Sequence, residues 1–64
     1  MYNKIVAING KYYTPDKKLS INRADALVAH NKVDVNLIID DVLQWVVTGG
    51  FEIKRIEVLN HVSM

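Results

Sequence analysis

The sequence predicts a small α+β domain, in which a three-stranded sheet carries helices on one face in the order β-β-α-α-β. Three observations lead to this fold class. Asn9-Gly10 separates two runs rich in β-branched and aromatic residues, polar residues recur at helical spacing over 34–48, and Gly49-Gly50 precedes a third strand-like run. A chain of 64 residues has room for one domain, residues 1–64, with a small core.

A β-hairpin in residues 2–14 is the clearest local signal. Asn9 and Gly10 accept the positive φ angles of a type I′ turn, whose twist matches two antiparallel strands. The expected cross-strand pairs are Ile8–Lys11, Ala7–Tyr12 and Val6–Tyr13. Both faces carry apolar side chains, so the hairpin alone leaves the inner face open. Pro15 ends the second strand because it has no N–H to donate, and residues 15–18 form a turn.

Two helices are expected between the hairpin and the third strand. Ser20 is the predicted N-cap of the first, in which apolar residues recur at spacings of three and four up to Asn31. Asp34 is the predicted N-cap of the second, which extends to residue 48. Its polar residues fall on one side and its apolar residues on the other, although many of the latter are β-branched and favour strands. The spacing of the polar residues favours the helix.

The Gly49-Gly50 pair ends the second helix, with one glycine in the left-handed conformation. Residues 51–59 follow as the third strand, and residues 60–64 are expected to fray. The alternation within this strand slips, because Phe51 and Ile53 share one face while Ile56 and Val58 share the other. Either a bulge lies near Lys54-Arg55, or the second half of the strand meets a different partner.

Composition excludes several classes of function. The net charge is only +1, and no polybasic cluster indicates non-specific nucleic-acid binding. The chain has no cysteine, no apolar run near the roughly 20 residues that span a membrane, and no signal-peptide pattern in its first eight residues. We therefore expect a protein of the reducing cytoplasm, without disulfides and without membrane contact.

No catalytic or metal-binding constellation is evident. His30 and His61 lack neighbouring ligands at metal spacing, and Ser20 is better explained as a cap than as a nucleophile. Asp40 and Asp41 diverge by about 100° on a helix, so they do not readily share a proton or a metal. The sequence therefore predicts a protein that is not an enzyme and holds neither a cofactor nor a metal.

Two arrangements of these elements would suit nucleic-acid binding. A helix-turn-helix would read DNA with residues 34–48, but that segment has carboxylates and no Lys or Arg. A sheet face could instead stack bases on Tyr12 and Tyr13 and meet phosphates with its cations, the candidates being Lys11, Lys54 and Arg55. The two tyrosines lie on opposite faces of the hairpin, which weakens such a platform.

Protein binding is the interpretation that the third strand favours. Its charged residues, with one tyrosine of the hairpin, are the predicted partner-binding residues: Arg55, Lys54, Glu52, Glu57 and Tyr12. Charges on an edge strand can simply block unwanted pairing. The same edge can also accept a strand from a partner. Trp45 lies within the apolar side of the second helix and is assigned to the core.

Residues 45–56 resemble the end of a known family, the gene 2 type inhibitors of host bacterial RNA polymerase made by short-tailed lytic phages. The matching residues are Trp45, Gly50, Phe51, Glu52, Ile53, Arg55 and Ile56. The resemblance implies a hairpin-helix-strand order and an arginine on the last strand that contacts the polymerase, a position filled by Arg55. The family's second basic position is Glu57 here, the hairpin is shorter, and the helical region is longer.

Together these observations predict a small non-enzymatic protein of phage or mobile-element origin. It would bind and inhibit a host protein, such as bacterial RNA polymerase, in the cytoplasm of the host cell. One alternative is a nucleic-acid-binding regulator that uses the sheet face. Another is a structural module that forms a homodimer through its third strand.

Overall fold

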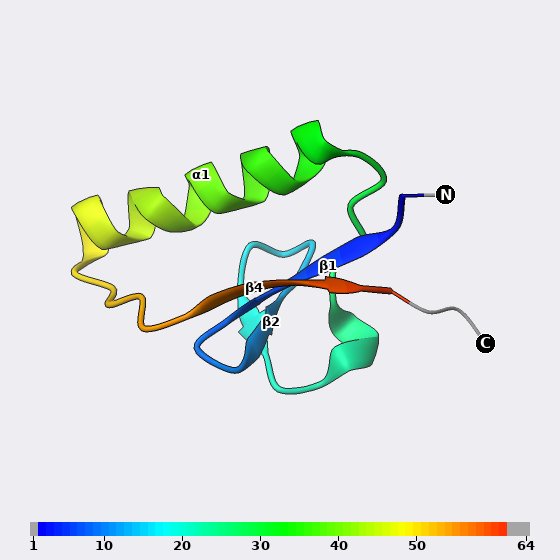
Figure 1. The fold of residues 1–64 in the computed structure, drawn as a ribbon. Coiled ribbons are helices and arrows are strands. Elements are labelled where there is room, and N and C mark those ends of the chain that lie inside the picture. The colour runs from blue at the N-terminus through cyan, green and yellow to red at the C-terminus, as the bar shows by residue number, and fades with distance from the viewer. Residues whose placement is uncertain (1, 62–64) are drawn as a thin grey trace.

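The computed structural model describes residues 2–61, in which one antiparallel sheet has the strand order β3-β2-β1-β4 (Figure 1). The strands are β1 (Lys4–Ile8), β2 (Lys11–Tyr13), β3 (Leu19–Ser20) and β4 (Ile56–Asn60). One helix, α1 (Lys32–Gly49), covers one face, and a 3₁₀ turn, η1 (Arg23–Asp25), lies on the other side of the sheet. The α+β class is confirmed, but the sheet has four strands rather than three, and the expected order β-β-α-α-β is wrong.

The hairpin between β1 and β2 forms as its turn residues dictate. Asn9 has a φ of 54° and Gly10 a φ of 82°, the positive values that a type I′ turn requires. The pairs Ala7–Tyr12 and Ile8–Lys11 are confirmed, but the pairing ends before the expected pair Val6–Tyr13, and the Tyr13 carbonyl accepts from the Leu27 N–H instead. On its other side β1 pairs with β4, which makes β1 a central strand of the sheet.

The strand β3 is an element that the sequence did not predict. After Pro15 the chain turns back, the Thr14 N–H donates to the Lys18 carbonyl over 2.9 Å, and Lys17 takes a φ of 59°. A three-residue hairpin loop with a left-handed last residue has this form. Ser20 therefore lies in β3, opposite Tyr12, and does not cap a helix.

The predicted helix over residues 21–31 is wrong. Only η1 turns helically within it, started by the Asn22 side chain, which accepts from the Ala24 N–H at 3.0 Å. The chain then extends, and Ala29 exchanges two hydrogen bonds of 2.9 and 2.7 Å with Lys4. The hairpin register would bring Pro15 beside the start of β1, where it has no N–H to offer. The backbone N–H and C=O groups of Lys4 therefore bond to Ala29 instead. This pairing between distant segments overrides the helical spacing of the apolar residues in 21–31.

The helix α1 begins and ends through local capping. Its N-cap is Asn31, whose Oδ1 accepts from the Asp34 N–H at 2.8 Å, so the prediction that Asp34 is the cap was three residues late. At the other end Gly50 adopts the left-handed conformation, with a φ of 68°. The N–H groups of Gly50 and Phe51 both donate to the Trp45 carbonyl, the second over 3.3 Å, and so satisfy a carbonyl of the last turn. The predicted glycine stop is confirmed.

The core lies between α1 and the sheet, which settles the face that the hairpin had left open. Buried side chains from both layers meet there: Val6, Ile8, Tyr13, Ala29, Val35, Ile38 and Val42. Ile5 and Ala7, on the opposite face of β1, are also buried. The central strand is thus covered on both sides, which explains why its sequence is apolar without alternation.

The third predicted strand, residues 51–59, is shorter in the structure. Only Ile56–Asn60 form β4, and residues 51–55 cross from the helix to the sheet as a loop. Phe51 and Ile53 pack against the core from this loop, as does Ile56 from the strand. The slip in alternation therefore marks the change from loop to strand and is not a bulge. The fraying expected for residues 60–64 is wrong for Asn60, which ends β4, and for His61, whose N–H donates to the Asn3 carbonyl; residues 62–64 fall outside the described part of the chain.

Candidate functional site

The loop after α1 is held by one side chain of the hairpin turn. Asn9 Oδ1 accepts from the backbone N–H groups of Lys54 at 2.7 Å and Arg55 at 3.1 Å. Its Nδ2 donates to the Glu52 carbonyl at 2.8 Å, and its own backbone N–H donates to the Arg55 carbonyl at 2.8 Å. We call this arrangement the Asn9 clamp. It fixes the backbone of the loop while leaving the loop's charged side chains in solvent.

Four of the five predicted binding residues lie at or next to this clamp. Glu52, Lys54 and Arg55 are exposed in the loop. Glu57 lies in β4, where its Oε1 is 3.0 Å from Arg55 Nε, and the two side chains are 68% and 40% exposed. An ion pair this open to water adds little stability, but it limits the orientations of the guanidinium group. A hollow of about 390 Å³ is lined by Asn9, Gly10, Lys54 and Arg55.

Tyr12 is the fifth predicted residue, and it occupies a different setting. It lies opposite Ala7, which in turn lies opposite Glu57, so these three side chains share the sheet face that looks away from α1. The Arg23 guanidinium is 5.9 Å from the centre of the Tyr12 ring. One ring face is therefore already engaged by a cation.

The outer side of β4 has no partner strand within residues 2–61. Arg55 and His61 direct backbone groups towards β1, because Asn9 donates to the Arg55 carbonyl and His61 donates to the Asn3 carbonyl. Alternation along a strand then points the N–H and C=O groups of Ile56, Val58 and Asn60 outward. Arg23 Nη2 donates to the Asn60 carbonyl at 2.7 Å and covers this end of the edge.

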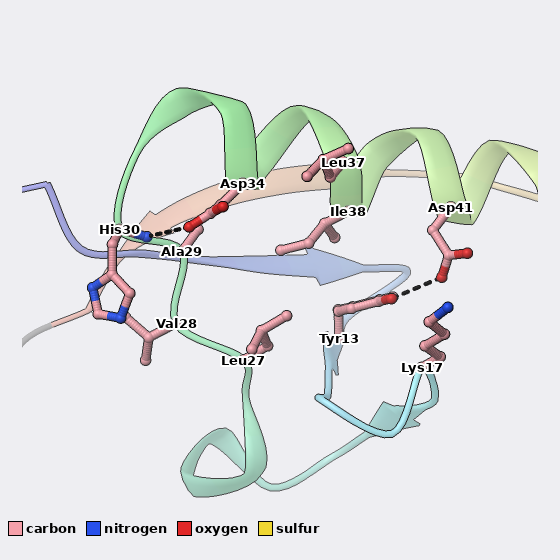
Figure 2. Close-up of a pocket in the computed structure, with 10 residues that line it drawn as sticks. All are labelled: Tyr13, Lys17, Leu27, Val28, Ala29, His30, Asp34, Leu37, Ile38 and Asp41. Carbon is pink, nitrogen blue, oxygen red and sulfur yellow. Dashed lines mark hydrogen bonds between the residues drawn. The ribbon is translucent and has the colours of Figure 1, made fainter.

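A second surface feature, which the sequence did not indicate, is an open cleft of about 580 Å³ beside α1 (Figure 2). Its walls come from α1, from residues 27–30 and from the β2–β3 region. The lining residues are Tyr13, Lys17, Leu27, Val28, Ala29, His30, Asp34, Leu37, Ile38 and Asp41. The Asp34 carboxylate accepts from the His30 N–H at 3.2 Å, and Asp41 accepts from the Tyr13 hydroxyl at 2.7 Å. Both carboxylates therefore have internal hydrogen bonds that position them.

The Tyr13 phenol is strongly perturbed by its surroundings. Burial, the hydrogen bond to Asp41 and the negative charge of that carboxylate together raise the pKa of Tyr13 to about 12. The unfolded chain releases this proton near its ordinary pKa of 10. Between these values the folded state holds more protons than the unfolded state, so rising pH reduces the free energy of unfolding.

We therefore expect the melting temperature to fall between about pH 10 and 12, and the fall to be smaller in Tyr13→Phe. Tyr12→Phe is the matched control, because it removes a phenol but leaves the Tyr13–Asp41 hydrogen bond in place. Circular dichroism melts over this pH range measure the effect. Parallel curves for the wild type and Tyr13→Phe would show that Tyr13 does not carry the pH dependence.

Within residues 2–61 no group of three His, Cys, Asp or Glu side chains is placed to hold a metal ion. His30 Nδ1 lies 3.1 Å from the side-chain oxygen of Asn3, which gives that ring an ordinary hydrogen-bonding role. Over the same residues, none of the helical structure has the length and apolar character needed to cross a bilayer.

Comparison with protein-family models, curated proteins and solved structures finds no match for this chain. Several residues that carry the resemblance to the phage inhibitors have structural roles here. Trp45 stacks on Tyr13 with ring centres 5.8 Å apart and meets Phe51 edge-on at 5.7 Å. Gly50 supplies the left-handed helix end. Arg55, in contrast, is exposed and has no place in the core.

Proposed function

We propose that this protein is a non-enzymatic binding protein that docks on another protein through the surface around the Asn9 clamp. This clamp surface comprises Asn9, Gly10, Glu52, Lys54 and Arg55. The observation that carries the proposal is the set of three hydrogen bonds from the Asn9 side chain to the loop backbone. They hold an exposed, charged loop in one conformation.

A fixed loop is suited to recognition because less conformational entropy is lost when a partner binds. Arg55 is the main candidate contact, since a guanidinium group donates two parallel hydrogen bonds to a carboxylate. Its ion pair with Glu57 orients it beforehand. The partner surface that fits is therefore one that presents carboxylates next to a groove for the hairpin turn.

The resemblance of residues 45–56 to the phage inhibitors nominates bacterial RNA polymerase as the first partner to test. In this proposal the protein comes from a phage or mobile element, acts in the cytoplasm of the host cell, and inhibits the polymerase by occupying a functional surface. The proposal requires neither a cofactor nor a catalytic residue.

We expect Arg55→Glu to reduce capture of purified bacterial RNA polymerase at least tenfold, because it replaces attraction by repulsion at the contact. The fold should survive, since the Arg55 side chain is 68% exposed. Lys32→Glu is the matched control: it makes the same change of charge at an exposed position at the far end of α1. Capture is measured on immobilised polymerase, with circular dichroism of each variant.

Full capture by folded Arg55→Glu would reject the clamp surface as the contact. If the wild-type protein does not bind the polymerase, that partner is rejected. A pull-down from bacterial lysate, with wild type and Arg55→Glu in parallel, then tests whether the clamp surface selects a different protein.

The nucleic-acid alternative has weaker support. Tyr13 is buried against Trp45 and Tyr12 is engaged by Arg23, so neither ring is freely available for stacking on a base. Salt dependence separates the two functions, because binding to phosphates weakens steeply with salt in proportion to the number of contacts.

A further inference from the structure

The two edges of the sheet are protected to very different degrees. The edge strand β3 has only two residues, too few to template another strand. The other edge strand, β4, has five residues, and its single charged residue is Glu57. The backbone groups of Ile56 and Val58 point outward along this edge. An open edge of this kind is a ready template for a strand from another chain.

An exposed apolar strip lies beside the β4 edge. The helix α1 runs along β1, because it starts after Ala29, paired with Lys4, and the loop after it is bound to Asn9 (Figure 1). Its Asp41 and Trp45 side chains contact Tyr13 on β2, so the opposite flank of the helix lies on the β4 side.

That opposite flank carries Leu43 and Val46, which are 46% and 38% exposed. Val58 of β4 is 43% exposed and lies opposite Val6, on the same sheet face as α1. We call these three residues the edge strip. An unpaired strand edge and an apolar strip therefore lie next to each other, and a single partner can cover both.

We infer that a second copy of this chain covers the edge strip, with the two β4 strands antiparallel about a two-fold axis at Val58. A two-fold interface uses the same patch on both copies, and an antiparallel pair of identical strands satisfies this condition. Val58 then meets Val58 of the other copy as a hydrogen-bonded pair, and Ile56 meets Asn60. The Asn60 carbonyl accepts from Arg23 and still has a second lone pair for the ladder.

The charge of Glu57 favours the register with the axis at Val58 over the register with the axis at Glu57. With the axis at Val58, each Glu57 faces Leu59 of the other copy, and no like charges are directly opposed. With the axis at Glu57, the two carboxylates would lie directly opposite each other, which destabilises strand pairing. The contact consists of one five-residue strand and three apolar side chains from each copy, so we expect a weak dimer that dissociates in the micromolar range.

This inference is independent of the proposed function, because it uses the edge strip and not the clamp surface. The test introduces a single cysteine into a chain that has none. In Val58→Cys the two sulfurs would be joined across the axis, since Cα atoms of a hydrogen-bonded pair are about 5.5 Å apart and disulfides span about 4.4–6.8 Å. We expect Val58→Cys to form a covalent dimer under mild oxidation much faster than Glu57→Cys. Faster cross-linking of Glu57→Cys would overturn the register.

The association itself is measured by sedimentation of the unmodified protein over a range of concentrations. Leu43→Lys should raise the dissociation constant of the dimer at least tenfold. Leu37→Lys is the matched control, because Leu37 is 61% exposed on the opposite side of α1, where it lines the cleft (Figure 2). A wild-type protein that stays monomeric to millimolar concentration, or equal effects of the two lysines, would overturn the inference.

Discussion

Trp45→Ala should remove most of the free energy that keeps the protein folded. The Trp45 ring lies between Tyr13, at 5.8 Å, and Phe51, at 5.7 Å, and so joins the helix, the sheet and the loop. Truncation of a large aromatic side chain in such a place costs about 3 kcal/mol or more. A domain of this size has a total stability of roughly 5 kcal/mol, so the loss removes most of it.

The measurement is urea unfolding followed by circular dichroism, because Trp45 is the chain's one tryptophan and its fluorescence is lost in the variant. Trp45→Phe keeps an aromatic ring in the stack and should cost much less. Val47→Ala, at a helical position that is 79% exposed, is the control for a change in α1 and should be nearly neutral. A stable Trp45→Ala protein that no longer captures its partner would instead assign Trp45 to an interface.

Asn9→Ala should be the next most damaging change, at about 2–3 kcal/mol. It removes three side-chain hydrogen bonds to the loop, each with a net contribution of about 1 kcal/mol or less at an exposed site. It also leaves alanine with a φ of 54°, in the left-handed region that side chains other than Asn and Asp rarely adopt.

Asn9→Gly separates these two causes, because glycine accepts positive φ but makes no clamp. We expect Asn9→Gly to lie between the wild type and Asn9→Ala in urea unfolding, and to weaken partner capture by freeing the loop. Wild-type stability in Asn9→Gly would show that the clamp adds nothing to the fold. Undiminished capture by the same variant would remove the main argument for the clamp surface.

The parts of the fold that depend on short-range chemistry were predictable from the sequence. The Asn9-Gly10 turn and the left-handed Gly50 each rest on a few adjacent residues, and both are confirmed. The helix over 34–48 was also found, although its true N-cap, Asn31, lies three residues before the predicted one. In each case the local conformational preference and the tertiary structure agree.

The predictions of secondary structure failed where hydrogen bonds to a distant segment of the chain determine the conformation. The segment 21–31 has helical spacing, yet Ala29 pairs with Lys4 because the start of β1 needs backbone partners. The same limit applies to the candidate site. Asn9 was correctly interpreted as a turn residue, but its bonds to Lys54 and Arg55 span most of the chain and leave no pattern in the sequence. The sequence therefore predicted the exposed charged residues of the site, but not that Asn9 holds the backbone of the loop that carries them.

The position of β1 between β2 and β4 also determines the order in which the chain can fold. β1 and β2 can pair as soon as the hairpin has been synthesised, since their partners are adjacent. The pairing of β1 with β4 joins Lys4 to Asn60, so it must wait for translation of nearly the whole described chain. High contact order of this kind slows folding. Until β4 leaves the ribosome, the apolar edge of β1 is open to other nascent chains, and this interval is when we expect aggregation to compete with folding.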